Sequence, residues 1–277
     1  MADDFVIEGT AEASLRSTLH RYNSRNAHNH GTVQHMNTPI PANPILAGPI
    51  PNAAMNAASS AAIAHAFLPN RWHYHYARSK LRSDPLYGGV AAALAGSAAP
   101  VLDLGCGVGL LAHCLRARGI AMPYRGVDND VGKIAQARDA AGRALLQDTA
   151  FECVDLSRQD ALQSLREHRG SVAILDVLQF LPPDALVPLL DAAVACLTPG
   201  ARLVIRTGLA DGSGRARVTR AVDSLSRALH WMNTGPKRYP DREALDAQLR
   251  GHGLDTRFAP LWGRTPFNNW LLVAGRD

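Results

Sequence analysis

The sequence predicts an α/β fold, in which a doubly wound, mostly parallel sheet carries helices on both faces. Short apolar stretches alternate with helical patterns between residues 101 and 205, as parallel βαβ units do. A turn with three glycines on alternate positions joins the first of these strands to its helix. Four strands in a row carry an aspartate inside them or at their carboxyl end. Ligands of such sheets bind at that edge, near the point where the strand order reverses.

Composition narrows the classes of protein and partner. The chain has 277 residues, of which 47% are hydrophobic, enough for a sizeable core. Its net charge of +5 comes without a long Lys/Arg run, so we expect no nucleic-acid partner. No stretch reaches the roughly 20 apolar residues of a membrane span, and the acidic start of the chain is unlike a secretory signal. Four cysteines without CxxC or zinc spacing predict reduced thiols, no metal site and a cytoplasmic protein.

Residues 1–66 differ from the rest and are predicted to form a largely disordered extension. They contain several prolines, many Asn and Ala residues and little periodicity, so they offer little apolar surface to offset chain entropy. The cluster of His28, His30 and His35 has no acidic or cysteine partner nearby and is interpreted as a solvated tail. Met36 and Met55 leave open a natural start further along the chain.

Residues 67–98 are predicted to form a helical cap at the start of the main domain, 67–277. Aromatic and basic residues interleave at near-helical spacing over 71–87, and Tyr76 and Lys80 share one helix face. Asp84-Pro85 breaks this helix and lets a second one begin. The cap is either an amphipathic helix packed on the domain or a lid over a cofactor pocket.

The following elements come in regular order. Strands are predicted at 101–104, 124–127, 151–154, 172–175 and 203–205. Helices are predicted at 110–118, 131–146, 159–168 and 185–196. The last part should hold helices at 219–232 and 241–250 and two strands at 258–262 and 270–274.

The motifs at these strand ends resemble those of class I S-adenosylmethionine-dependent methyltransferases. Val-Leu-Asp-Leu-Gly-Cys-Gly-Val-Gly at 101–109 is similar to their first motif, and Gly-Val-Asp at 126–128 to their acidic second-strand end. Cys-Val-Asp-Leu at 153–156 is similar to the adenine-contacting position, and Leu-Thr-Pro-Gly at 197–200 to the turn before the fifth strand. The resemblance implies a Rossmann-like, seven-stranded sheet with a final antiparallel strand, and S-adenosylmethionine as cofactor.

The resemblance also implies roles for single residues. Asp103 would orient the amino group of the cofactor, either directly or through a water molecule. Asp128 would accept hydrogen bonds from its ribose, and Asp155 would read its adenine edge. The full set of implied cofactor-binding residues is Asp103, Gly105, Cys106, Gly107, Gly109, Asp128, Asn129, Asp155, Leu156, Asp176 and, from the lid, Tyr76 and Lys80. The alternative for any one aspartate is a helix N-cap, which we expect for Asp130 and Asp184.

The acceptor is expected to be a small, aromatic or partly apolar molecule that receives the methyl group by in-line transfer. The Asn/Asp-Pro-Pro-Tyr motif of base and amide methylation is replaced by Asp-Val-Leu-Gln-Phe at 176–180. Candidate bases or positioning groups are His73, His75, Gln179 and His230. The runs 71–87 and 261–270 are also similar to methyltransferases that accompany bacterial aryl-polyene pathways, which implies a phenolic or aryl acceptor.

Two other functions fit parts of the pattern. A nicotinamide-dependent oxidoreductase would need GxGxxG, whereas this chain has GxGxG with Leu110 at the position of the last glycine. Asp103, inside the strand, would also lie close to an anionic pyrophosphate. A non-catalytic methyltransferase-like binding domain would carry the same aspartates as the enzyme.

Overall fold

One seven-stranded sheet forms the centre of the protein, in the order β3-β2-β1-β4-β5-β7-β6. The computed structural model describes residues 50–51, 53–210, 239–263 and 268–276. The strands are β1 (Val101–Leu104), β2 (Tyr124–Asp128), β3 (Thr149–Cys153), β4 (Ser171–Leu175), β5 (Leu203–Gly208), β6 (Asp255–Pro260) and β7 (Asn269–Gly275). The strand order reverses at β1, which pairs with both β2 and β4.

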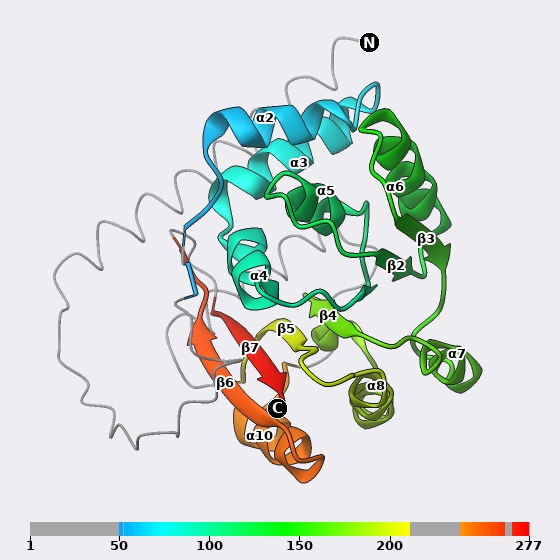
Figure 1. The fold of residues 1–277 in the computed structure, drawn as a ribbon, viewed down its shortest axis with the longest axis vertical. Helices are drawn as coiled ribbons and strands as arrows, with labels where there is room; N and C mark the ends of the chain where they lie inside the picture. Colours follow the sequence, from blue (N-terminus) through cyan, green and yellow to red (C-terminus); the bar gives the residue numbers. More distant parts are fainter. Residues whose placement is uncertain (1–49, 52, 211–238, 264–267, 277) are drawn as a thin grey trace, which may run out of the picture. The chain divides into compact units, whose positions relative to one another are not determined.

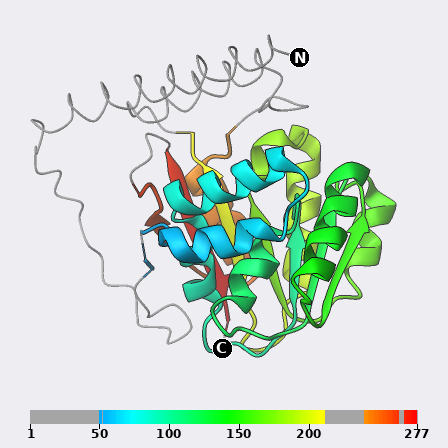
Figure 2. The same cartoon turned by 90° about the horizontal axis from the view of Figure 1, so that it is seen from above.

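Helices cover both faces of the sheet (Figures 1 and 2). One face buries apolar residues of α2 (Ala57–His65), α3 (Arg71–Ser83), α4 (Leu86–Leu94), α5 (Leu110–Arg116) and α6 (Val131–Arg143). The other face buries residues of α7 (Gln159–Leu165), the 3-10 turn η2 (Leu178–Phe180), α8 (Pro183–Ala195) and α10 (Arg242–Gly251). The predicted doubly wound α/β fold is therefore confirmed.

The sheet is parallel except for β7. This strand pairs antiparallel with β5 and with β6, which confirms the predicted antiparallel hairpin at the edge. The predicted bounds 258–262 for the first hairpin strand are wrong, since β6 ends at Pro260 and leaves Trp262 outside it. The strand predicted at 151–154 also begins earlier, because β3 follows the register of β2 from Thr149 to Cys153.

Helix α2 corrects the predicted domain boundary. It lies inside the segment 1–66 that the sequence assigned to a disordered extension. Asn56 caps its first turn, and Ile63 and Ala64 are buried against the core. Phe67, just beyond the helix, is fully buried. A few buried apolar side chains therefore order an alanine-rich stretch whose sequence has little helical periodicity. The part of the predicted extension up to residue 49 lies outside the described residues.

The predicted helical cap is formed by α3 and α4. The chain breaks at Asp84-Pro85 as expected, with Pro85 at the N-cap of α4. Asp84 supports the break, because its Oδ1 accepts a hydrogen bond from the Leu86 amide at 3.0 Å.

In the described part of the chain, no helix combines the length and apolarity that crossing a bilayer requires.

Candidate functional site

The glycine turn between β1 and α5 has the conformation that its sequence demands. Gly105, Gly107 and Gly109 have φ angles of +81°, +56° and +79°, in the left-handed region that disfavours residues with a Cβ. At Gly105 and Gly109 a Cβ would also collide with Val177 and Phe151, at 2.3 and 2.7 Å. A Cβ at Gly107 would meet no atom within 4 Å. Two glycines thus allow internal packing, and the middle one borders open space.

The end of β2 holds this turn in place. The amides of Gly105 and Cys106 donate to the carbonyl of Val127 at 2.7 and 2.9 Å. The carboxylate of Asp128 accepts from the Gly107 amide at 2.9 Å and from the Asp130 amide at 3.0 Å. Asp128 therefore fixes the turn and still has lone pairs for further donors.

Cys106 packs inside the turn. A Cβ at Gly126 would lie 2.8 Å from its Sγ, so the thiol occupies the space that a missing side chain leaves. Burial raises the pKa of Cys106 above its ordinary value. The thiol is therefore protonated and serves as packing at neutral pH.

Asp103 is buried inside β1, and one hydrogen bond from the described residues reaches its side chain. Its Oδ2 accepts from the hydroxyl of Tyr124 at 2.6 Å, and within the described residues its Oδ1 has no hydrogen-bond partner. Burial raises the pKa of Asp103 to about 7; the Tyr124 hydrogen bond lowers the pKa and the charge of Asp128 raises it. The sequence pattern did not reveal Tyr124, because its contact with Asp103 depends on the pairing of β1 with β2.

Three of the other predicted cofactor residues gather around the ends of β2 and β3. Asn129 and Asp155 are exposed and Leu156 is buried. The amide of Val154 donates to the carbonyl of Asp128 at 2.9 Å, which joins the two strand ends. The sequence predicted Asp155 directly at the end of its strand. In the structure β3 ends at Cys153, so Asp155 comes two residues after the strand. Hydrogen bonds from the hydroxyl and amide of Ser157 lower the pKa of Asp155, so its carboxylate is ionised in an exposed turn.

Four charged side chains form a network at the carboxyl end of β4, where Asp176 follows the strand and Arg206 belongs to the neighbouring β5. The guanidinium of Arg206 lies 2.7 Å from Asp84 and 2.8 Å from Asp176. The ammonium of Lys80 lies 2.8 Å from Asp84 and 3.4 Å from Asp176. Burial disfavours the charged forms of Asp84 and Lys80, but their partners outweigh it. Lys80 and Arg206 hold the pKa of Asp84 well below its usual range, and the carboxylates of Asp84 and Asp176 raise the pKa of Lys80. Asp176 has a φ of +61°, a strained backbone that the network fixes.

Helix α3 crosses the carboxyl edge of the sheet. At its start, His73 Nδ1 lies 3.1 Å from Oε1 of Gln136 on α6. Seven residues later, Lys80 reaches Asp176 after β4. Seven residues of an α-helix are about 10 Å long, which is close to the distance across two strand spacings of a sheet, such as that between β2 and β4. The helix therefore connects α6 with the residue that follows β4.

The remaining predicted residues have different surroundings. Tyr76 is exposed and stacks on Trp72, with ring centroids 5.4 Å apart. His75 is exposed. Gln179 is buried, donates to the carbonyl of Asp176 at 3.1 Å and lies 3.4 Å from the Thr207 hydroxyl. His230, with the helix predicted at 219–232, lies outside the described residues. The expected N-cap role of Asp130 is confirmed by its bond from the Lys133 amide, whereas Asp184 lies within α8.

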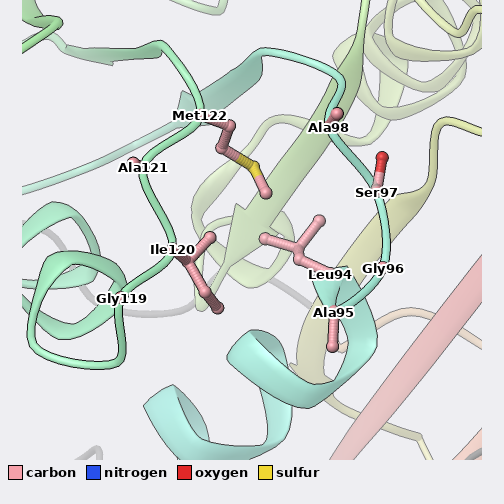
Figure 3. Close-up of a pocket in the computed structure, with 9 residues that line it drawn as sticks. All are labelled: Leu94, Ala95, Gly96, Ser97, Ala98, Gly119, Ile120, Ala121 and Met122. Carbon is pink, nitrogen blue, oxygen red and sulfur yellow. The ribbon is translucent and has the colours of Figure 1, made fainter.

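A pocket of about 310 Å³ lies at the opposite edge of the sheet. Its walls come from the last residue of α4 and from the loops that precede β1 and β2, and Leu94, Ile120 and Met122 point toward one another there (Figure 3). Since these loops enter the amino ends of the strands, the pocket is separate from the glycine turn and its aspartates.

Comparisons with known proteins agree with this architecture. Residues 101–200 match a family described as a methyltransferase domain. A carboxy-S-adenosyl-L-methionine synthase of Geobacter metallireducens is 33% identical over 144 residues, covering 47% of this chain and 56% of that protein. The chain thus spans little more than half the length of this curated relative.

Solved structures show the same fold at low sequence identity. An O-methyltransferase family protein from Burkholderia thailandensis has a TM-score of 0.54 and 19% identity, over 76% of this chain and 61% of that chain. Magnesium protoporphyrin IX methyltransferase from Synechocystis, solved with bound S-adenosylhomocysteine, has a TM-score of 0.50 and 18% identity, over 69% and 82% of the two chains. Residues 101–200 therefore match a methyltransferase-domain family, and the described chain has the Rossmann-like fold that its motifs predict.

Proposed function

We propose that this chain is an S-adenosylmethionine-dependent methyltransferase that acts on a small, aromatic or partly apolar acceptor. The observation that carries the proposal is the turn at Gly107. It offers open space beside the backbone, with the carboxylates of Asp103 and Asp128 belonging to the strands on which it rests. The carboxylate of Asp103 is buried and has no cation beside it among the described residues, which suits a ligand that brings positive charge.

Different residues at the carboxyl edge of the sheet would contact different parts of the cofactor. Gly105, Cys106, Gly107 and Gly109 would lie under its methionine part, and Asp103 would receive its ammonium. Asp128 would accept hydrogen bonds from the ribose hydroxyls, and Asn129, Asp155 and Leu156 would surround the adenine. Asp176, together with Tyr76 and Lys80 of α3, would close the methionine side. The bound cofactor would supply a methyl group already activated on a sulfonium.

Hydrogen bonds of the turn disfavour the dinucleotide alternative. A pyrophosphate needs free N–H groups at such a turn. Here the amides of Gly105 and Cys106 are bound to Val127, and that of Gly107 is bound to Asp128. These three donors are satisfied within the chain, which supports a ligand that needs no anion site at these amides.

Catalysis would rest mainly on alignment and the exclusion of water, which can contribute roughly 7–11 kcal/mol in favourable cases. Helix α3 would exclude water from above the turn, since it is anchored at both ends. His73 is engaged with Gln136 and Gln179 with the backbone of Asp176, so we propose positioning roles for both. His75 and His230 stay candidate bases.

The acceptor is the narrower part of the proposal. We propose a phenolic or aryl group, which the exposed, stacked rings of Trp72 and Tyr76 on α3 could contact. Methyl-labelled S-adenosylmethionine should be incubated with phenols and with their saturated ring analogues, using the full chain and its Asp128→Asn variant. Label transferred only to phenols, and only by the unaltered chain, would support the proposal.

Other results of this assay lead to different conclusions. Transfer to the saturated analogues alone would refute the aryl acceptor and leave the methyltransferase. Cofactor binding without transfer to any compound would favour the non-catalytic binding domain. Oxidation or reduction of a nicotinamide cofactor by the chain would favour the oxidoreductase.

A further inference from the structure

We propose that Tyr124 is a positioning residue that holds Asp103 ready for the ammonium of the cofactor, and that cofactor binding releases a proton from Asp103. The inference rests on the proposed function and extends it to a residue on β2 and to the linkage between binding and pH. Asp103 and Tyr124 are 2% exposed each, and their side chains are 2.6 Å apart.

The surroundings of Asp103 explain why it would hold a proton in the free protein. The groups that act on it are the hydroxyl of Tyr124 from β2 and the carboxylate of Asp128 from the end of that strand. The thiol of Cys106 approaches from the turn, and the hydroxyl of Tyr87 on α4 lies near Tyr124. None of these groups is a cation. Burial without a positive partner disfavours the ionised form, and the pKa of Asp103 is about 7.

Asp84 provides a comparison within the same molecule. It is about as buried as Asp103, with 7% and 2% of the residues exposed. Asp84 contacts Lys80 and Arg206, and its pKa is held well below the usual range of a carboxyl. The difference between the two aspartates is the presence of cations, which an ammonium placed against Asp103 would supply.

The proton balance of the step is simple. In the free protein the carboxyl group of Asp103 carries a proton. When the ammonium of the ligand binds beside this group, the O–H bond breaks and the proton passes to the buffer. With a pKa of Asp103 of about 7 in the free protein, most of one proton should be released on binding at pH 6 and little of it at pH 8. Affinity should therefore fall as the pH falls below 7.

Tyr124 has a specific part in this balance. Its hydroxyl donates to Oδ2, which stabilises the ionised form and lowers the pKa of Asp103. It also leaves Oδ1 as the oxygen without a partner in the described residues. Replacing Tyr124 by Phe keeps the ring and removes only the hydroxyl. The pKa of Asp103 should rise, and the pH midpoint of cofactor binding should move upward by about one unit.

The test is a calorimetric titration of the full chain with S-adenosylhomocysteine, which keeps the ammonium. Each titration is run at several pH values between 6 and 8, in two buffers of different ionisation enthalpy, so that the difference in heat gives the number of protons released. The Asp103→Asn variant cannot lose this proton and measures any release by the ligand itself. Tyr74→Phe, the same change on a half-buried tyrosine of α3, is the matched control for Tyr124→Phe.

The expected result is a proton release that is larger at pH 6 than at pH 8 and that disappears in Asp103→Asn. The pH midpoint of binding should rise in Tyr124→Phe and stay unchanged in Tyr74→Phe. Infrared spectra of the free protein should show a protonated carboxyl that titrates near pH 7 and is missing in Asp103→Asn. Binding with equal proton release by the unaltered chain and Asp103→Asn would overturn the inference and leave the proposed function intact. Failure of the ligand to bind at every pH would instead overturn the proposed function.

Discussion

The sharpest test of the glycine turn is the substitution Gly107→Ala. The new methyl group would meet no protein atom within 4 Å, so it would project into the space assigned to the cofactor. The φ of +56° makes alanine unfavourable by about 1 kcal/mol through backbone strain. Because bound atoms contact a surface at about 3.5–4.0 Å, the methyl should displace the ligand and weaken binding at least tenfold, about 1.4 kcal/mol.

The chain offers a matched control for this strain. Gly119 also has a positive φ, +73°, and a Cβ there would likewise meet nothing within 4 Å. It lies in the loop before β2, away from the turn. Both variants should lose similar stability in urea unfolding, but only Gly107→Ala should lose affinity for S-adenosylhomocysteine in calorimetry. If Gly107→Ala binds as tightly as Gly119→Ala, the ligand does not lie on this turn.

Two further predictions concern stability. Arg206→Met would leave the buried Asp84 and the half-buried Asp176 with Lys80 as their remaining cation among the described residues, so the free energy of unfolding should fall by about 3 kcal/mol; a loss below about 1 kcal/mol would show that the network is not important for folding. His113 packs on Phe67, and burial lowers its pKa to about 4, so the folded state favours the neutral ring. The free energy of unfolding should therefore fall by up to about 3 kcal/mol as the pH falls from 6.5 to 4. Urea unfolding of His113→Leu should show no such loss.

The local elements of the site were predictable because their signals are local. An apolar strand, alternate glycines and a helical pattern specify the turn after β1 within a dozen residues. The break before α4 follows from Asp84-Pro85 in the same way, and the N-cap role of Asp130 from its place before α6. These features depend on the backbone preferences of neighbouring residues, and such preferences follow from residue type alone.

Contacts between distant residues were not predictable in this way. Tyr124 meets Asp103 because two strands pair, and Arg206 meets Asp84 across 122 positions of sequence. Neither contact has a periodic signal. Helix α2 was missed because its ordering comes from Ile63 and nearby apolar residues entering the core, which outweighs the weak pattern of its own sequence.

The most direct test of the central claim is the choice of ligand. The full chain should be titrated in parallel with S-adenosylhomocysteine and with NAD in a calorimeter at pH 8, where Asp103 is largely ionised. We predict one molecule of S-adenosylhomocysteine bound per chain and no heat of binding with NAD. Binding of NAD in place of S-adenosylhomocysteine would contradict the assignment of this edge to a methyl donor.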